Sequence, residues 1–110
     1  MSTVDVRPGM ITVSGELDLA LTDHVSALGR QAVESCPGSV LVIDVSRVTF
    51  ADSSGIGALL EVRSFAQRHH VEVVLRGAST GLVRVLEISG LRPYFQTLPS
   101  PVEQPAGRVD

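Results

Sequence analysis

Hydrophobic and polar residues alternate in two short segments near the start of the chain. Residues 4–6 and 11–13 carry valine or isoleucine at every second position, which is the period of a strand buried on one face. Pro8 and Gly9 stand between them. Proline fixes the first angle of a turn and glycine accepts the positive φ of the second, so the pattern predicts a β-hairpin.

Three later segments repeat their apolar residues at helical spacing. This stripe predicts three helices, over residues 21–32, 59–66 and 82–89. Thr22 or Asp23 is the expected N-cap of the first helix, and Ser79 or Thr80 that of the third, because short polar side chains satisfy the free amides of a first turn.

Apolar runs between these helices predict further strands, at residues 40–43, 71–75 and 94–97. The run at 40–43 is continuous, which favours a strand buried on both faces beneath helices. In the last run, Tyr94 and Phe95 are expected in the core. The order of elements predicts an α/β domain whose later strands are parallel and joined by right-handed crossovers.

The length of 110 residues suits one domain. We expect it to span residues 1–98. Residues 99–110 hold three of the six prolines and no periodic pattern, which predicts a disordered tail.

Composition and charge exclude several classes of function. The formal net charge is −3, and the nine basic residues are all arginines spread along the chain, which argues against a nucleic-acid partner. Mechanisms that need a lysine are excluded. No apolar run reaches the length of a membrane span, so no membrane partner is expected. The single cysteine, Cys36, permits no intrachain disulfide and fits a reduced, cytoplasmic protein.

One segment concentrates candidate chemistry at the start of the second helix: Asp52, Ser53, Ser54, Gly55 and Gly57. Glycine within a helix costs about 1 kcal/mol relative to alanine, so two of them in one turn need a reason. Close access of another molecule to the serine hydroxyls is one such reason, and helix N-termini also favour anions. The alternative is that the polar residues simply cap the helix.

The surrounding motifs resemble those of the STAS domain family, specifically its bacterial anti-sigma factor antagonists. The resemblance covers roughly residues 4–97 and is carried by four segments in the family's order: Gly15-Glu16-Leu17-Asp18, Asp44-Val45-Ser46, Phe50 to Gly57, and Ile88-Ser89-Gly90-Leu91. It implies a single STAS-like domain, with an N-terminal hairpin leading into a mixed, largely parallel sheet of about five strands and three main helices. The proline-rich end departs from the family, which usually adds another helix there.

The resemblance also implies a mechanism of partner switching. The first serine of the pair, Ser53, would be phosphorylated by an anti-sigma factor that is a serine kinase, and a PP2C-like serine phosphatase would reset it. The unphosphorylated antagonist would bind the anti-sigma factor and free a sigma factor. The expected partner-binding residues are Asp18, Asp52, Ser53, Ser54, Gly55 and Gly57; Asp18 could equally be an ordinary loop aspartate. No catalytic residue, metal or cofactor is expected.

Two rival functions remain from sequence alone. The first is a scaffold or accessory STAS domain in a signalling or lipid-transport complex. The second is a small hydrolase that uses Ser53 or Ser54, although no motif spacing supports a catalytic triad. Nucleotide binding is rejected because residues 55–60 lack the third glycine of a dinucleotide fingerprint. The pair His69-His70 is expected to close the second helix.

Overall fold

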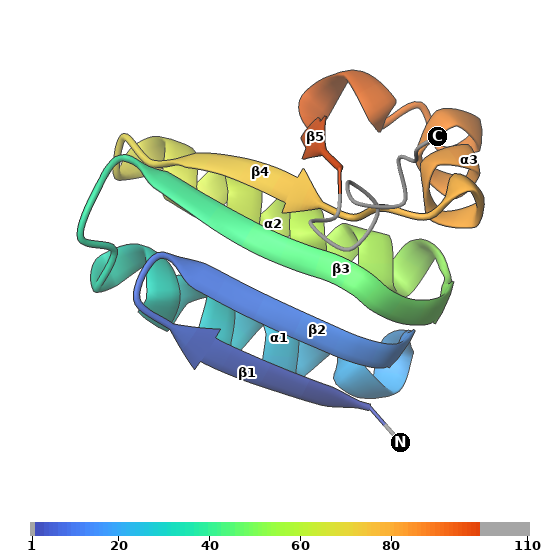
Figure 1. Ribbon diagram of the computed structural model, residues 1–110, viewed down its shortest axis with the longest axis horizontal. Helices are drawn as coiled ribbons and strands as arrows, with labels where there is room; N and C mark the ends of the chain where they lie inside the picture. The colour runs from blue at the N-terminus through green and yellow to red at the C-terminus, as the bar shows by residue number, and fades with distance from the viewer. Residues whose placement is uncertain (1, 100–110) are drawn as a thin grey trace, which may run out of the picture.

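The computed structural model describes residues 2–99, and they form one five-stranded sheet with three α-helices and a 3₁₀ turn (Figure 1). The elements are β1 (Thr3–Arg7), β2 (Met10–Leu17), α1 (Leu19–Glu34), β3 (Val40–Ala51), α2 (Ser53–Arg68), β4 (Glu72–Arg76), α3 (Thr80–Ile88), η1 (Arg92–Tyr94) and β5 (Gln96–Leu98). The strand order follows the sequence order, β1-β2-β3-β4-β5. The predicted tail lies, from residue 100 onward, outside the described residues.

The predicted α/β architecture is confirmed. β1 pairs with β2 in the antiparallel sense, and every later pair of neighbouring strands is parallel. The hairpin turns at Pro8 and Gly9, with Arg7 opposite Met10 and with Gly9 at a φ of +75° that glycine alone adopts readily.

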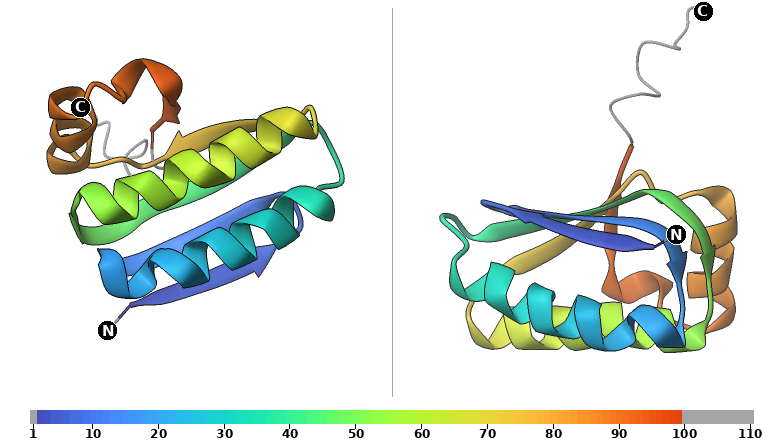
Figure 2. Two further views of the ribbon diagram at one scale, coloured as in Figure 1. Left: turned by 180° about the vertical axis from the view of Figure 1, so that it is seen from behind. Right: turned by 90° about the horizontal axis from the view of Figure 1, so that it is seen from below.

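Helices α1 and α2 lie side by side across one face of the sheet (Figure 2). Alternate residues of the central strands face these helices and are fully buried: Ile11 and Val13 in β2, and Leu41, Ile43 and Val45 in β3. This alternation is what a sheet with one covered face requires.

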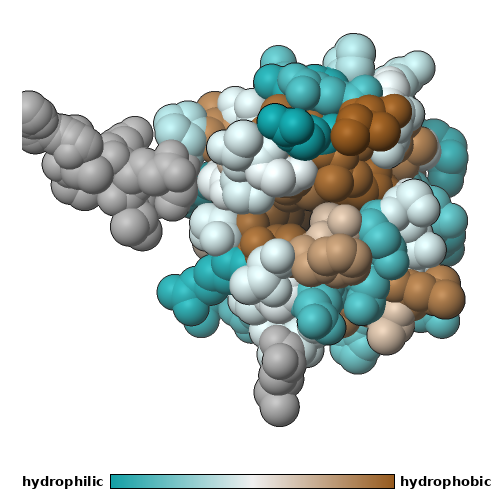
Figure 3. All heavy atoms as spheres, turned by 90° about the vertical axis from the view of Figure 1, so that its right-hand side faces the viewer, coloured by the Kyte–Doolittle hydropathy of each residue, from teal (hydrophilic) through white to brown (hydrophobic). Residues whose placement is uncertain are grey.

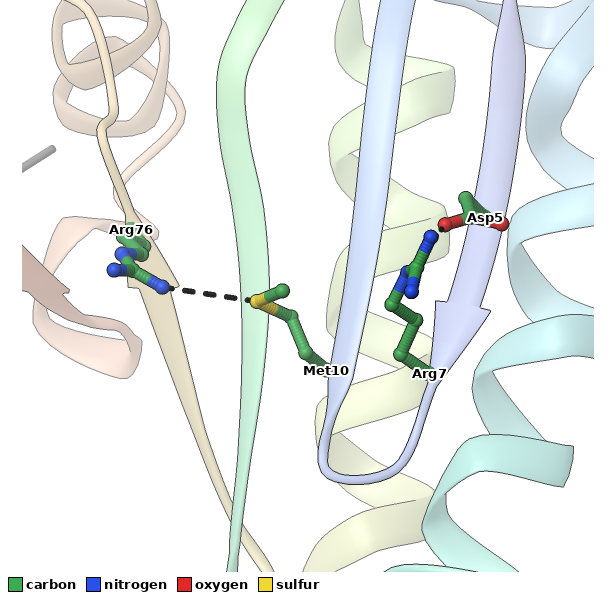
Figure 4. A network of polar contacts seen from close by, with 4 residues as sticks. All are labelled: Asp5, Arg7, Met10 and Arg76. Atoms are coloured by element: carbon green, nitrogen blue, oxygen red, sulfur yellow. Dashed lines mark hydrogen bonds and ion pairs between the residues drawn. The ribbon is translucent and has the colours of Figure 1, made fainter. Parts of the chain in front are cut away.

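Within residues 2–99, no helix covers the opposite face of the sheet, so the prediction that residues 40–43 are buried on both faces is wrong. Val40 is 44% exposed. Neighbouring strands of the sheet follow one another in sequence. Because the connections between parallel strands are right-handed, successive helices then pack on the same side of the sheet. On the open face, Arg76 extends across β3 to within 3.7 Å of the Met10 sulfur, and the side chains of Arg7 and Asp5 pair at 3.2 Å (Figure 4).

The third strand, β3, is longer than predicted and changes partners along its length. It pairs with β4 only as far as Asp44, opposite Arg76, and continues to Ala51 beside β2 alone. Two register shifts in the β2–β3 ladder accompany this second half, and the two strands curve together out of the plane of the sheet (Figure 2). This curvature carries the end of β3 toward the start of α2.

The first helix begins earlier than predicted, and neither Thr22 nor Asp23 is its cap. Asp18 is the N-cap, with its carboxylate accepting the Ala20 amide at 3.2 Å. The Thr22 hydroxyl lies one turn further on and donates to the Asp18 carbonyl at 3.1 Å. For the third helix, the candidate Ser79 is confirmed, because its hydroxyl accepts the Leu82 amide at 3.1 Å.

The last predicted strand is partly correct. Residues 92–94 form the 3₁₀ turn η1, and β5 starts only at Gln96. Phe95 is buried as expected, but Tyr94 is 50% exposed, so its prediction as a core residue is wrong. The Arg63 guanidinium lies over the Tyr94 ring, 5.2 Å from its centroid, and this contact holds the ring at the surface.

Candidate functional site

The site begins where β2 and β3 end together. Leu17 and Ala51 are register partners, and the Asp52 amide donates to the Leu17 carbonyl at 3.2 Å. Since parallel strands end at the same edge of a sheet, the next residues, Asp18 and Asp52, start two packed helices side by side. The structure therefore brings together the two candidate aspartates from distant parts of the sequence.

Asp52 alone caps α2. Its backbone is extended, with φ −117° and ψ −178°, and its carboxylate accepts the Gly55 amide at 3.0 Å. Neither serine hydroxyl takes part in a hydrogen bond among the described residues. The capping interpretation is therefore correct for Asp52 and does not extend to Ser53 or Ser54.

The two serines differ in exposure. Ser53, the first residue of α2, is exposed, and Ser54 is half-buried. The hydroxyl of Ser53 thus stands on the surface at a helix N-terminus, where the first amides and the helix dipole favour negative charge. Within the described chain, neither Asp18 nor Asp52 forms an ion pair, so no arginine already neutralises this corner.

The two glycines of the motif have different surroundings. Gly55 is buried, and a Cβ at this position would overlap the Leu17 carbonyl oxygen and lie 2.7 Å from the Leu17 Cγ. Internal packing therefore requires this glycine, and access to the serines does not explain it. A Cβ on Gly57 would meet no atom within 4 Å, so packing leaves that position open.

The Asp-x-Ser part of the motif shapes the strand that leads to the site. The Asp44 carboxylate accepts from the Ser46 amide at 2.9 Å and from its hydroxyl at 2.6 Å. These contacts lie at the first register shift between β2 and β3 and stabilise the irregularity of the strand there. We therefore assign this pair a structural role.

An apolar surface surrounds the site and was not predicted from sequence. Leu19 is 72% exposed, Phe50 54% and Ile88 80%. At the end of the molecule where β3 ends and α3 lies, hydrophobic side chains gather around a hollow (Figure 3). A cavity of about 220 Å³ lies there between β3 and α3. Leu19 lies outside the apolar helical stripe that starts at residue 21. This position was the signal in the sequence that its side chain would be exposed.

The remaining sequence candidates lie away from this corner. His69 caps the C-terminus of α2, with its Nδ1 3.0 Å from the Phe65 carbonyl oxygen, which confirms its place at the helix end. Cys36 is half-buried, with its sulfur 3.4 Å from the Val40 carbonyl oxygen. Over residues 2–99, no three histidine, cysteine or acidic side chains group as metal ligands would. The helices of this range are too short or too polar to cross a membrane.

The closing motif of the third helix behaves as its residues predict. Ser89 is the C-cap of α3, Gly90 follows with φ +75°, and the Leu91 amide donates to the Leu86 carbonyl at 2.8 Å. This is the glycine-terminated helix end in which the chain reverses and its next apolar residue folds back.

Comparison with solved structures shows the same fold in two functional settings. The unphosphorylated anti-sigma factor antagonist SpoIIAA aligns over the whole of both chains, with a TM-score of 0.71 and 20% identity. A sulfate transporter family protein from Wolinella succinogenes aligns over 92% of this chain and 84% of its own, with a TM-score of 0.75 and 18% identity. At these identities the comparison establishes the fold alone.

Sequence comparison gives the family. The anti-sigma-B factor antagonist of Listeria monocytogenes serovar 1/2a is 33% identical over 86 residues, which are 78% of this chain and 75% of that protein. The family described as "Mlab, STAS domain" matches residues 3–97. The chain therefore belongs to the STAS domain family.

Proposed function

We propose that this protein is a cytoplasmic anti-sigma factor antagonist that acts by binding and not as an enzyme. Its unphosphorylated form binds an anti-sigma factor with serine kinase activity and so releases a sigma factor. Phosphorylation of Ser53 ends the binding, and a PP2C-like phosphatase restores it. The observation that carries the proposal is an exposed Ser53 hydroxyl that forms no hydrogen bond with residues 2–99, on a helix that Asp52 already caps.

The surface around Ser53 suits a docked protein. Leu19 and Phe50 are large apolar side chains that remain mostly exposed, and they follow Asp18 and precede Asp52 in the chain. Gly57 lies one helical turn after Ser53 and leaves the outer side of α2 flat. A partner covering these residues would remove water from the serine hydroxyl.

Phosphate would oppose that contact by its charge. It adds about −1.5 to −2 charges beside the carboxylate of Asp52. A charge that loses its water without gaining a cation costs several kcal/mol. A penalty of ~4 kcal/mol corresponds to about a thousandfold loss of affinity. The same phosphate is tolerated by the antagonist itself, because it sits at the N-terminus of α2.

The direct test is phosphorylation of the full chain by its anti-sigma factor kinase and ATP, read by mass spectrometry of the resulting peptides. We expect one phosphate, on Ser53, and none on the Ser53→Ala variant. The Ser54→Ala variant is the matched control and should be modified at the wild-type rate. Phosphate on Ser54 alone, or undiminished modification of Ser53→Ala, would overturn the residue assignment.

A second candidate is an accessory STAS domain of a transport complex. The structural similarity to a sulfate transporter family protein supports it. The test is affinity capture from native cells, with and without phosphatase treatment. Capture of an anti-sigma factor that increases after phosphatase treatment supports the switch, whereas a stable membrane complex indifferent to that treatment supports the accessory role.

The hydrolase alternative has no support in the geometry. Among the described residues, no histidine forms a hydrogen bond with Ser53 or Ser54, and a serine nucleophile needs such a base. Turnover of an activated ester that disappears in Ser53→Ala would favour this alternative over the switch.

A further inference from the structure

Among the described residues, 2–99, no strand pairs with the outer edge of the second half of β3, which we call its free edge. β4 leaves β3 after Asp44, and residues 45–51 then pair with β2 only. Backbone N–H and C=O groups point alternately to the two edges of a strand, so roughly half of those in this segment point away from β2. Ser46 directs its amide to the Asp44 carboxylate, but no backbone hydrogen bond joins residues 47–51 to α3 within the described chain.

Helix α3 stands beside this edge without closing on it (Figure 1). The space between them is the cavity of about 220 Å³, which we call the edge groove. Its walls are four consecutive strand residues and the facing side of the helix: Val48, Thr49, Phe50, Ala51, Ser79, Gly81, Leu82 and Val85. The glycine thins the helix wall, and most of the remaining side chains are apolar, with Thr49 and Ser79 as the polar ones.

Two features of the edge groove favour an extended peptide as its ligand. Its strand wall offers hydrogen bonds that only a backbone in strand conformation can satisfy in register, and its helix wall offers apolar contact for alternate side chains. Recognition by strand addition uses this combination of a free sheet edge and side-chain pockets. A lipid chain has no donors or acceptors and would leave the backbone groups unpaired.

Charge defines the segment further. Arg47 precedes the strand wall, and Arg84 lies one turn from Gly81 on α3; both are exposed. The ion pair found in residues 2–99, between Arg7 and Asp5, involves neither of them. An acidic side chain on the incoming segment would therefore find a partner at the rim of the edge groove.

We propose that the edge groove binds an extended segment of a partner protein, with alternate apolar residues and a flanking acidic residue, as an added strand beside β3. The site ends at Ala51, two residues before Ser53, so the segment would run beside the start of α2. The inference goes beyond the proposed switch, because it concerns how a partner's backbone is held and does not require that Ser53 be phosphorylated.

The test begins with a phage-displayed library of random twelve-residue peptides, selected on the full chain. We expect the selected peptides to share alternate apolar residues and an acidic flank. A synthetic selected peptide should bind Val85→Arg, whose side chain fills the edge groove, at least about tenfold more weakly than wild type. Glu87→Arg, an exposed change on the same helix, is the matched control and should bind as wild type.

A second measurement separates strand addition from side-chain docking and does not depend on a folded variant. N-methylation of alternate peptide amides removes the donors along one edge of the peptide. Since backbone hydrogen bonds would hold the added strand, loss of two should weaken binding by at least about tenfold. Bound peptide should also slow hydrogen exchange at amides of residues 48–51, as seen by NMR.

Several outcomes would overturn the inference. They are peptides that bind Val85→Arg as tightly as wild type, N-methylated peptides of either register that bind undiminished, and selected sequences that bind as helices. A dimer in sedimentation that Val85→Arg dissolves would show a second copy as the occupant. The two proposals can fail separately. If the protein binds the peptide as expected but its anti-sigma factor kinase does not phosphorylate it, the strand-addition site is supported and the phosphorylation switch is refuted.

Discussion

The inner and outer sides of the first turns of α2 are built to opposite requirements. On the inner side, Gly55 touches the Leu17 backbone so closely that no side chain fits. On the outer side, Ser53 is exposed and Gly57 faces open space. Neighbouring residues of one short motif therefore have two different roles. Gly55 lets the helix pack against the sheet, and Ser53 and Gly57 lie on the surface.

The difference separates the residues that the fold itself explains from those for which we propose a partner contact. Gly55 and Asp52 are fully accounted for within the chain, by packing and by capping. Ser53 and Gly57 make no described contact that would select a serine or a glycine. Glycine lowers helix stability at Gly57 without a packing contact that requires it, and the proposed docking surface would give it a reason.

The largest effect is expected on the inner side, from Gly55→Ala. The added methyl would press on backbone atoms of Leu17, which cannot move without disturbing the β2–β3 ladder. Overpacking of this kind should lower the free energy of unfolding by about 3 kcal/mol, measured by urea denaturation. A Gly55→Ala variant as stable as the wild type would contradict this interpretation, because it would show that the inner side of α2 has room for a side chain.

On the outer side, Ser53→Asp should weaken binding to the anti-sigma factor by about a hundredfold, since a fixed negative charge loses its water in the interface. Titration calorimetry measures the affinity. Ser53→Ala is the control and should bind as wild type while resisting inactivation by kinase and ATP. Equal affinities for the two variants would contradict the outer-side role of this residue.

The cap should have an intermediate effect. Asp52→Ala removes the acceptor of the Gly55 amide and should cost about 1 kcal/mol of stability, seen as a lower thermal midpoint. Ser54→Ala, which removes a hydroxyl with no described hydrogen bond, is the comparison and should change stability by less than about 0.5 kcal/mol. A larger loss of stability in Ser54→Ala than in Asp52→Ala would mean that Ser54 shares the capping role.

The smallest effect, and the sharpest contrast with Gly55, is expected from Gly57→Ala. Because the position is open, alanine should raise the free energy of unfolding by about 0.5–1 kcal/mol through its better helix propensity. The methyl would stand on the docking surface and should reduce affinity for the anti-sigma factor by several-fold. A stabilised variant with undiminished affinity would place the interface elsewhere.

Much of the fold could be predicted because short-range patterns determined it. The alternation at residues 4–13 and the stripes of the three helices give the element types, and the element order gives the parallel sheet. The open face could not be predicted in this way. An apolar run such as 40–43 looks the same under one layer of helices or two, and only the observed strand order decides between them.

The site was predictable in its position but not in its division of roles. Gly55 is explained by Leu17, a residue of another strand, and no local pattern reveals that contact. Asp18 caps α1 although Thr22 and Asp23 stand closer to the apolar stripe, because the end of β2 sets where the helix starts. The free edge of β3 depends on where β4 leaves it, which is likewise a property of the folded sheet.

The most direct measurement compares one preparation of the protein before and after stoichiometric phosphorylation at Ser53. Affinity for the anti-sigma factor and thermal unfolding are both measured on the same samples. We expect a loss of affinity of about a thousandfold with an unfolding midpoint that does not fall. Unchanged affinity, or a loss that only accompanies unfolding of the domain, would contradict it.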